Sequence, residues 1–134
     1  EQNGHYHSLS PSITVAEGSV LSLEEKFQGG TGINITPPPA ELFSDAQIAQ
    51  IKRDIEKTAA ALKIENYARI DIFFNIRTSQ MLVIEANALP GLTPSTVIYH
   101  QALAERSPLY PREFLELLIK LKSRSVTLQQ QVAA

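Results

Sequence analysis

Two short apolar runs joined by a polar turn are the part of this sequence that most constrains its fold. The runs cover residues 68–74 and 81–86, and both are rich in β-branched and aromatic side chains. This length and composition are typical of strands, and the polar connection at residues 75–80 predicts an antiparallel hairpin. Because side chains alternate between the two faces of a strand, the register of the hairpin decides which polar residues meet.

Polar side chains recur at alternate positions along this hairpin. One face of the first run carries Arg69, Asp71 and Phe73, and one face of the second carries Met81, Val83, Glu85 and Asn87. If the hairpin folds about Thr78, Asp71 lies opposite Glu85. Arg69 then lies opposite Asn87. A register shifted by an odd number of residues would separate the two sets.

Two carboxylates opposite each other on one sheet face need an explanation, because like charges in that position destabilise a sheet. A divalent cation would remove the repulsion. Mg²⁺ prefers oxygen ligands from one or two carboxylates, phosphates and water, and the Asn87 amide oxygen would add one more. Arg69 would face the same phosphates or a developing anion. The alternative is a solvated arginine–carboxylate cluster, since structural ion pairs gather charges in the same way.

The order of these residues resembles the catalytic end of the ATP-grasp ligases, and most closely the D-alanine–D-alanine ligase family. The matching string is Arg69-Ile70-Asp71 followed by Glu85-Ala86-Asn87-Ala88-Leu89-Pro90-Gly91-Leu92-Thr93. The resemblance implies that Asp71, Glu85 and Asn87 hold Mg²⁺ (or Mn²⁺) across the phosphates of ATP. It also implies that Arg69 stabilises the acyl-phosphate oxygens and the tetrahedral intermediate.

The loop after this motif is implied to bind substrate. In the family it supplies a backbone N–H and a hydroxyl that hold the carboxylate of the second amino acid, and the resemblance implies that Gly91 is one of the substrate-binding residues. The family's serine aligns best with Thr96, and Ser95 lies beside it, so both hydroxyls are candidates. From the residues alone, Ser95 is expected to cap a helix over roughly residues 96–105.

A glycine-rich stretch at residues 28–32 follows Glu24-Glu25-Lys26-Phe27. By composition it is a flexible surface turn, and without a GK[ST] sequence it is not a Walker P-loop. By resemblance it belongs to the mobile loop that covers ATP and substrate, with Lys26 as a phosphate contact. Phe27 stands where family members that form D-alanyl-D-alanine usually have Tyr, and this leaves a D-alanine–D-lactate ligase open.

Helical patterns lie on both sides of the hairpin. Ser44 and Gln47 form a capping-box pattern at the start of a helix over residues 44–63. Its apolar stripe is Ile48, Ile51, Ile55, Ala59 and Leu62, and its solvated side is interpreted as Lys52, Arg53, Glu56 and Lys57. Pro111 suits the first turn of the last helix. The packing stripe of that helix is Phe114, Leu115, Leu118, Ile119 and Leu121.

These patterns predict one α+β domain with a largely antiparallel sheet and helices packed on one face. Strands and the mobile loop are expected in residues 1–36, the catalytic hairpin in residues 67–87, helices in residues 95–124, and a tail that frays in residues 125–134. By resemblance, this is the C-terminal half of an ATP-grasp domain.

Composition excludes several classes of function. With 134 residues and a net charge of −2, the chain has no strongly basic surface of the kind that nucleic-acid binding requires. No apolar run reaches the length of about 18 residues that a membrane span needs. The absence of Cys excludes disulfides and thiolate metal sites.

The resemblance implies the catalytic C-terminal portion of an ATP-dependent D-alanine–D-alanine ligase of the cytoplasm. Such an enzyme joins two D-amino acids through an acyl phosphate in the synthesis of peptidoglycan precursors for the cell wall. Its expected partners are D-alanine, ATP and a missing N-terminal part of the same enzyme, without which this chain is expected to be inactive. The full-length enzyme is compatible with a homodimer.

Two other classes of function remain open from the sequence. The first is a different ATP-grasp carboxylate–amine ligase with another acceptor. The second is a non-catalytic module that uses the acidic hairpin only to bind a cation or a partner.

Overall fold

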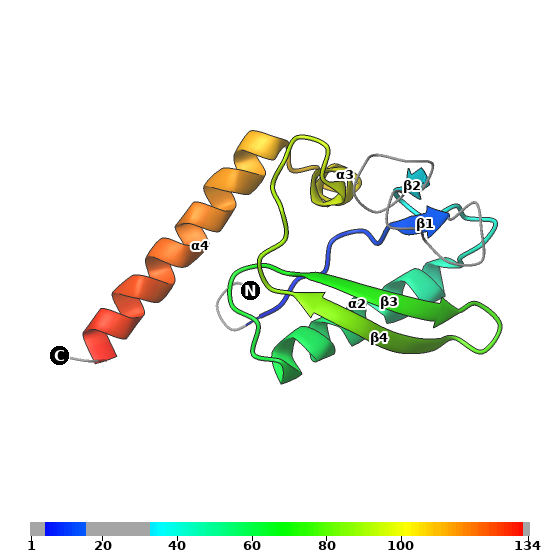
Figure 1. Ribbon diagram of the computed structural model, residues 1–134, viewed down its shortest axis with the longest axis horizontal. Coiled ribbons are helices and arrows are strands. Elements are labelled where there is room, and N and C mark those ends of the chain that lie inside the picture. Colours follow the sequence, from blue (N-terminus) through cyan, green and yellow to red (C-terminus); the bar gives the residue numbers. More distant parts are fainter. Residues whose placement is uncertain (1–4, 16–32, 133–134) are drawn as a thin grey trace.

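The computed structural model of the chain in Figure 1 describes residues 5–15 and 33–132. Within these residues, helices and two small antiparallel sheets agree with the expected α+β class. The elements are β1 (Ile13–Val15), β2 (Ile33–Ile35), α2 (Asp45–Ala61), β3 (Arg69–Asn75), β4 (Gln80–Asn87), α3 (Val97–Leu103) and α4 (Pro111–Val132). None of the helices in the described residues combines the length and the apolar character that crossing a membrane requires.

The first sheet pairs β1 with β2, with Ile13 opposite Ile35. Both strands are short and β-branched, as strands usually are. They lie within the residues 1–36 for which strands were expected. The glycine-rich stretch at residues 28–32 lies outside the described residues.

Helix α2 begins at the predicted capping box. The Gln47 backbone N–H donates to Ser44 Oγ at 3.3 Å, and the Ser44 N–H donates to Gln47 Oε1 at 3.0 Å. These two bonds satisfy donors that the first turn of a helix otherwise leaves unpaired. Of the predicted apolar stripe, Ile51 and Ala59 are buried, whereas Leu62 follows the end of the helix and is 54% exposed.

Helix α2 runs alongside the β3–β4 hairpin (Figure 1), and contacts near the turn fix the two together. The Gln50 side-chain amide donates to the Ser79 carbonyl at 2.8 Å. The rings of Phe43 and Phe74 lie 5.9 Å apart between their centroids, within the range of favourable aromatic pairs. One face of the hairpin is therefore turned towards the helix, whereas Phe73 and Leu82 on the other face are 66% and 65% exposed.

A small apolar core joins α3 to the beginning of α4. Its buried members are Ile98, Tyr99, Ala102 and Phe114, and the partly buried Leu9, Tyr67, Leu92, Leu109 and Leu118 pack against them. The rings of Tyr99 and Phe114 meet edge to face, with centroids 6.0 Å apart. Because Leu92 belongs to the loop that leaves β4, the core supports that loop.

Helix α4 begins at Pro111 as predicted, but its packing stripe is narrower than expected. Phe114 is 4% exposed, whereas Leu115 and Ile119 are 38% and 66% exposed. Figure 1 shows why, because most of α4 extends away from the rest of the molecule. The helix continues to Val132, beyond residue 124, where the sequence pattern placed its end.

Two of the α2 residues interpreted as solvated face other parts of the chain instead. Lys52 Nζ lies 2.9 Å from Glu105 Oε1, and the Glu105 side chain is only 15% exposed. Glu56 Oε1 accepts a hydrogen bond from the Ser8 backbone N–H at 2.9 Å. The interpretation was wrong for both residues because Glu105, which follows α3, pairs with Lys52, and the segment before β1 contacts Glu56.

Helix α2 and the segment before β1 both contact Glu105. Besides Lys52, the Ser10 hydroxyl donates to Glu105 Oε1 at 2.9 Å, and His7 Nε2 lies 3.4 Å from Glu105 Oε2. Burial by itself would raise the pKa of the Glu105 carboxyl. The hydrogen bonds from Lys52 and Ser10 and the positive charges of Lys52 and His7 outweigh burial, so this pKa lies below its usual 4.5.

We expect Glu105→Gln to lower the thermal midpoint at pH 7 by about 5 °C, because the ion pair with Lys52 and its charge-assisted hydrogen bonds are lost. A lowered folded-state pKa means that the carboxylate stabilises the fold fully above pH 4.5, its unfolded value. That contribution disappears as the pH falls through the lower, folded value. Thermal melts of both proteins from pH 7 downward should therefore converge in acid.

The matched control is Glu116→Gln, which makes the same chemical change in an exposed pair with Arg112 on α4. Exposed pairs of this kind contribute little to stability, so its midpoint should stay near that of the unmodified protein. A gap between Glu105→Gln and the unmodified protein that persisted unchanged at pH 3 would contradict the role of the Glu105 charge.

Candidate functional site

The hairpin brings the polar residues together in the predicted pairs. Strands β3 and β4 are antiparallel, with Arg69 opposite Asn87 and Asp71 opposite Glu85. This register confirms the pairing expected from the sequence. It gathers a guanidinium group, two carboxylates and one side-chain amide at the end of the hairpin from which the loop to α3 departs.

The pairing depends on a β-bulge. Towards the turn, Ile72 pairs with Val83, whereas the next residue, Asp71, pairs with Glu85, so that Ile84 is an extra residue in β4. If the ladder continued without this extra residue, Ile84 would lie opposite Asp71. Glu85 would then point to the other face of the sheet. The bulge therefore assembles the carboxylate pair.

The same bulge overturns one expectation from the sequence. Met81 pairs with Phe74 and Val83 with Ile72, so neither shares the face that carries Asp71 and Glu85. The residue opposite Phe73 on the charged face is Leu82. The prediction was wrong because strict alternation along β4 does not survive an inserted residue.

Arg69 bridges the two carboxylates. Its Nε lies 2.9 Å from Asp71 Oδ1, and its Nη2 lies 3.1 Å from Asp71 Oδ2 and 3.4 Å from Glu85 Oε1. The arginine thus offsets the repulsion between the acids, as the ion-pair interpretation expects. The side chains of Arg69, Asp71 and Glu85 are 36%, 34% and 49% exposed, so all three remain accessible to a ligand.

The oxygen donors of this cluster fit a hard cation. Asp71, Glu85 and Asn87 offer carboxylate and amide oxygens on neighbouring positions of one sheet end, and Mg²⁺ favours such donors. Asn87 Oδ1 also accepts the Leu89 backbone N–H at 3.0 Å, which orients the amide towards the start of the loop. Among the described residues, no group of three or more His, Cys, Asp and Glu side chains could hold a metal. Such a cation would therefore depend on further oxygens from phosphates and water.

The loop between β4 and α3 contains the predicted substrate contacts. Gly91 is exposed, and a Cβ added there would meet no atom within 4 Å. Ser95 is exposed, but it does not cap α3. Thr96 is the N-cap of this helix, and its side chain makes no capping hydrogen bond. The cap expected at Ser95 and the helix start expected at residue 96 were thus one residue early.

Two further residues contact this loop, and no local sequence pattern indicated them. The Tyr99 hydroxyl donates to the Leu92 carbonyl at 3.2 Å, and the Tyr67 hydroxyl donates to the Pro90 carbonyl at 3.5 Å. Tyr99 lies in a stretch whose sequence indicates only a helix, and Tyr67 lies where the sequence indicates only the start of a strand. The contacts of their hydroxyls with the loop are therefore evident only in the folded chain. Lys26 and Phe27, in contrast, lie outside the described residues.

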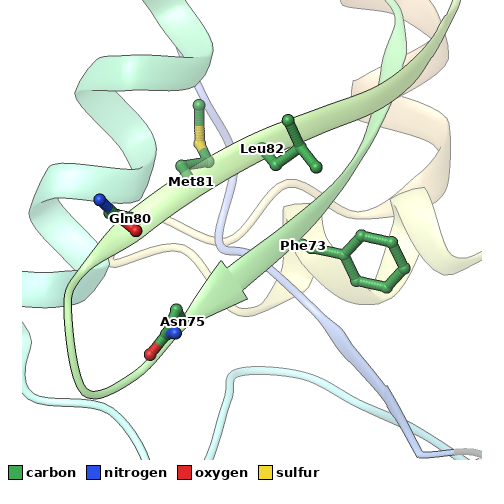
Figure 2. A pocket seen from close by; sticks show the side chains of 5 residues that line it. All are labelled: Phe73, Asn75, Gln80, Met81 and Leu82. Atoms are coloured by element: carbon green, nitrogen blue, oxygen red, sulfur yellow. The ribbon is translucent and has the colours of Figure 1, made fainter.

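The turn end of the hairpin has a shallow surface depression of about 500 Å³ (Figure 2). It is lined by Phe73, Asn75, Gln80, Met81 and Leu82. Phe73 and Leu82 are 66% and 65% exposed, and they continue the face that carries the charged cluster. The depression includes none of the charged residues, so it adjoins the candidate site and is not its centre.

Comparison with known proteins gives a consistent result. A family model described as "D-ala D-ala ligase C-terminus" matches residues 2–120. A D-alanine–D-alanine ligase from Lacticaseibacillus casei is 38% identical over 104 residues, which are 77% of this chain and 27% of that protein. The ligase of the same name from Tolumonas auensis is 32% identical over 108 residues, or 81% of this chain and 32% of that protein.

A third relative extends the comparison to another genus. The D-alanine–D-alanine ligase of Vibrio cholerae is 30% identical over 95 residues, or 70% of this chain and 28% of that protein. The chain therefore spans about a quarter to a third of the length of these curated relatives. No solved structure gives a significant match.

Proposed function

The chain belongs to the D-alanine–D-alanine ligase C-terminal family, and we propose that it is the catalytic C-terminal portion of an ATP-dependent D-alanine–D-alanine ligase. The observation that carries this proposal is the meeting of Arg69, Asp71, Glu85 and Asn87 at one end of the hairpin. An ATP-grasp domain completed by upstream residues, working in the cytoplasm on cell-wall precursors, is part of the same proposal.

The reaction would proceed in two steps. The carboxylate of the first D-alanine attacks the γ-phosphorus of ATP, which forms an acyl phosphate and releases ADP. The amine of the second D-alanine then attacks the acyl carbon, phosphate leaves, and the amine loses a proton. Negative charge develops on the transferring phosphoryl group in the first step and on the acyl oxygen in the second. Cationic hydrogen-bond donors held in fixed positions stabilise both charges.

The hairpin supplies groups suited to both steps. Asp71, Glu85 and Asn87 would hold Mg²⁺ (or Mn²⁺), which neutralises phosphate charge and orients the phosphates when bound. Arg69 would face the acyl-phosphate oxygens with its planar donor fork. Its present contacts to both carboxylates keep the guanidinium at the site, 2.9 Å from Asp71.

The loop after β4 would bind the second D-alanine. A backbone N–H and a hydroxyl from Ser95 or Thr96 suit the carboxylate of that substrate. Gly91 has open space on its Cβ side, which leaves room for a ligand close to the backbone. The Thr96 hydroxyl makes no capping hydrogen bond and Ser95 does not cap α3, so both hydroxyls stay candidates for this contact.

The exposed apolar side chains on the charged face fit a nucleotide. Phe73 and Leu82 lie opposite each other on that face (Figure 2). In the strand register they are nearer the turn than Asp71. An apolar surface beside a few convergent polar groups is the usual composition of a ligand site. The base of ATP would cover this surface while its phosphates reach the carboxylates. Lys26, which lies outside the described residues, would contact the phosphates.

One residue favours a second candidate acceptor. Phe27 stands where ligases of this family that form D-alanyl-D-alanine usually have Tyr, and the missing phenol removes a hydrogen bond near the second substrate. D-lactate, whose hydroxyl would replace the attacking amine, is therefore the alternative acceptor. The product in that case would be an ester in place of a peptide.

The test is ADP release from Mg-ATP by the full-length protein that contains this chain, with D-alanine, D-alanine plus D-lactate, or L-alanine. We expect release and a dipeptide product with D-alanine, no turnover with L-alanine, and no turnover by the 134-residue chain alone. An ester product would identify the D-lactate enzyme. Failure of every substrate would overturn the ligase proposal and leave the hairpin as a cation- or partner-binding module.

A further inference from the structure

Glu105 joins the end of α3 to two other parts of the chain. Its two carboxylate oxygens lie 2.9 and 3.2 Å from Lys52 Nζ on α2, and its Oε1 accepts a hydrogen bond from the Ser10 hydroxyl at 2.9 Å. The Ser10 oxygen also lies 3.3 Å from the carbonyl oxygen of Ala104, the C-cap of α3. Ser10, Lys52 and Glu105 together form what we call the polar junction.

The polar junction is largely closed to solvent. The side chains of Glu105 and Lys52 are 15% and 25% exposed. Exposed ion pairs contribute little to a structure, but breaking a largely buried, hydrogen-bonded pair is costly because it leaves an uncompensated charge. The polar junction therefore holds the segments that it connects in fixed positions.

On one side of the polar junction, α2 is bonded to the hairpin that carries the charged cluster. The Gln47 side-chain amide donates to the Ile76 carbonyl at 2.9 Å. The Gln50 side-chain amide donates to the Ser79 carbonyl at 2.8 Å. Figure 1 shows α2 alongside this hairpin, and α3 beside the start of α4. The carboxylates of the hairpin are thus positioned relative to α2.

On the other side, α3 carries the loop that would bind the acceptor. The helix has only seven residues, and its N-cap Thr96 makes no side-chain capping bond, so it depends on tertiary contacts for its position. Its buried residues pack with Phe114 of α4, and none of the described members of that core comes from α2. The polar junction therefore adds a direct connection between the α3 side of the molecule and α2.

We propose that Ser10, Lys52 and Glu105 are positioning residues that place the loop between β4 and α3 relative to the carboxylates of the hairpin. The loop ends at Thr96 and α3 follows it as one short helix, so a shift at Glu105 moves the end of the loop as well. Resting on the proposed function, the ligand affected is the second D-alanine, which must meet an acyl phosphate held at the hairpin. Misplacement of reacting groups by about 1 Å can slow a reaction strongly. The polar junction should accordingly affect the acceptor more than ATP.

Lys52→Met and Glu105→Gln in the full-length protein test this role, because each keeps the approximate size of the side chain and removes its charge. We expect each to raise KM for the acceptor D-alanine about three- to tenfold and to leave KM for ATP unchanged. The double variant should be no worse than the more affected single variant, because both substitutions remove the same ion pair. Ser10→Ala, which keeps that ion pair, should raise the acceptor KM about twofold.

The matched control is Lys57→Met, the same substitution on the same helix. The Lys57 side chain is 77% exposed and its partner Asp54 also lies on α2, so this pair does not connect α2 to α3. Neither KM should change. A lower thermal midpoint of Lys52→Met and Glu105→Gln with both KM values unchanged would make the polar junction merely structural and overturn the proposal. An equal rise in both KM values, or effects that multiply in the double variant, would overturn it as well.

Hydrogen exchange separates this proposal from the ligase assignment, since it needs no turnover. Amide exchange in residues 93–103 should be faster in Lys52→Met and Glu105→Gln, whereas exchange in β3 should stay the same. If the unmodified protein is inactive with D-alanine, the ligase assignment fails, and faster exchange in residues 93–103 still supports the polar junction. Exchange equal to that of the unmodified protein in both variants overturns the polar junction, whether or not the enzyme is active.

Discussion

Replacing Glu85 by Gln in the full-length enzyme is expected to lower the rate of ADP release with D-alanine at least about a thousandfold. The amide keeps the shape of the side chain and loses its charge, so the hairpin should still form. Glu85 lies opposite Asp71, and the pair is the main source of negative charge for a cation at this site. A carboxamide is a much weaker ligand for Mg²⁺ than a carboxylate.

The matched control for this prediction is Glu65→Gln, which makes the same change at an exposed residue just before β3. Its turnover should equal that of the unmodified enzyme. Circular dichroism and the thermal midpoint of Glu85→Gln should also be unchanged, since Glu85 is 49% exposed and lies 3.4 Å from Arg69. Asp71→Asn is expected to behave in the same way.

Mg²⁺ dependence distinguishes the two interpretations of the cluster. If Glu85 holds the cation, the residual activity of Glu85→Gln should require a higher Mg²⁺ concentration for half-saturation. If the cluster is only a solvated ion pair, the substitution should leave turnover and Mg²⁺ dependence near normal. The second outcome would remove the metal-binding role from Asp71, Glu85 and Asn87 together.

The sequence was sufficient for features that depend on local periodicity or on a specific capping residue. The capping box at Ser44 and the helix start at Pro111 are confirmed, because each is decided by a few neighbouring residues. The pairs of Arg69 with Asn87 and of Asp71 with Glu85 are confirmed as well. They were reached by assuming that strands pair in a regular antiparallel ladder.

That assumption was correct at only one end of the hairpin. A regular ladder about Thr78 would place Phe74 opposite Leu82, whereas Phe74 pairs with Met81. The turn is tighter than assumed, and the bulge at Ile84 restores the assumed register just where the carboxylates meet. A bulge has no strong signature in the local sequence. The sequence therefore could not show that the tighter turn and the bulge shift the register by opposite amounts.

Contacts between different elements likewise could not be predicted from local sequence patterns. Lys52 occupies a position of α2 that reads as solvated, yet its partner Glu105 lies 53 residues away along the chain. The tyrosines that contact the loop after β4 are separated from their acceptors by 23 and 7 residues. Amphipathic periodicity gives the face of a helix, but it does not show which distant segment covers that face.

Phe114→Ala is expected to lower the free energy of unfolding by about 3–5 kcal/mol, the largest effect on stability that we predict. Phe114 is 4% exposed and meets Tyr99 edge to face in the core between α3 and α4. Replacing Phe114 by Ala removes buried apolar surface and leaves a cavity that a small core cannot easily fill. Because typical domains are stable by only about 5–15 kcal/mol, the loss should be visible as a large shift in urea unfolding.

Ile119→Ala is the matched control on the same helix, since Ile119 is 66% exposed and its truncation should cost less than about 0.5 kcal/mol. Urea unfolding of the full-length protein, followed through the transition that includes this region, compares the two variants. Phe114→Ala should also speed hydrogen exchange in residues 91–96, because Tyr99 loses its ring partner and with it the fixed position of its hydroxyl. If Phe114→Ala cost no more than Ile119→Ala, the α3–α4 core would not support the substrate loop. The loop would then have to be held from the hairpin side alone, through the hydrogen bond from Tyr67 to Pro90.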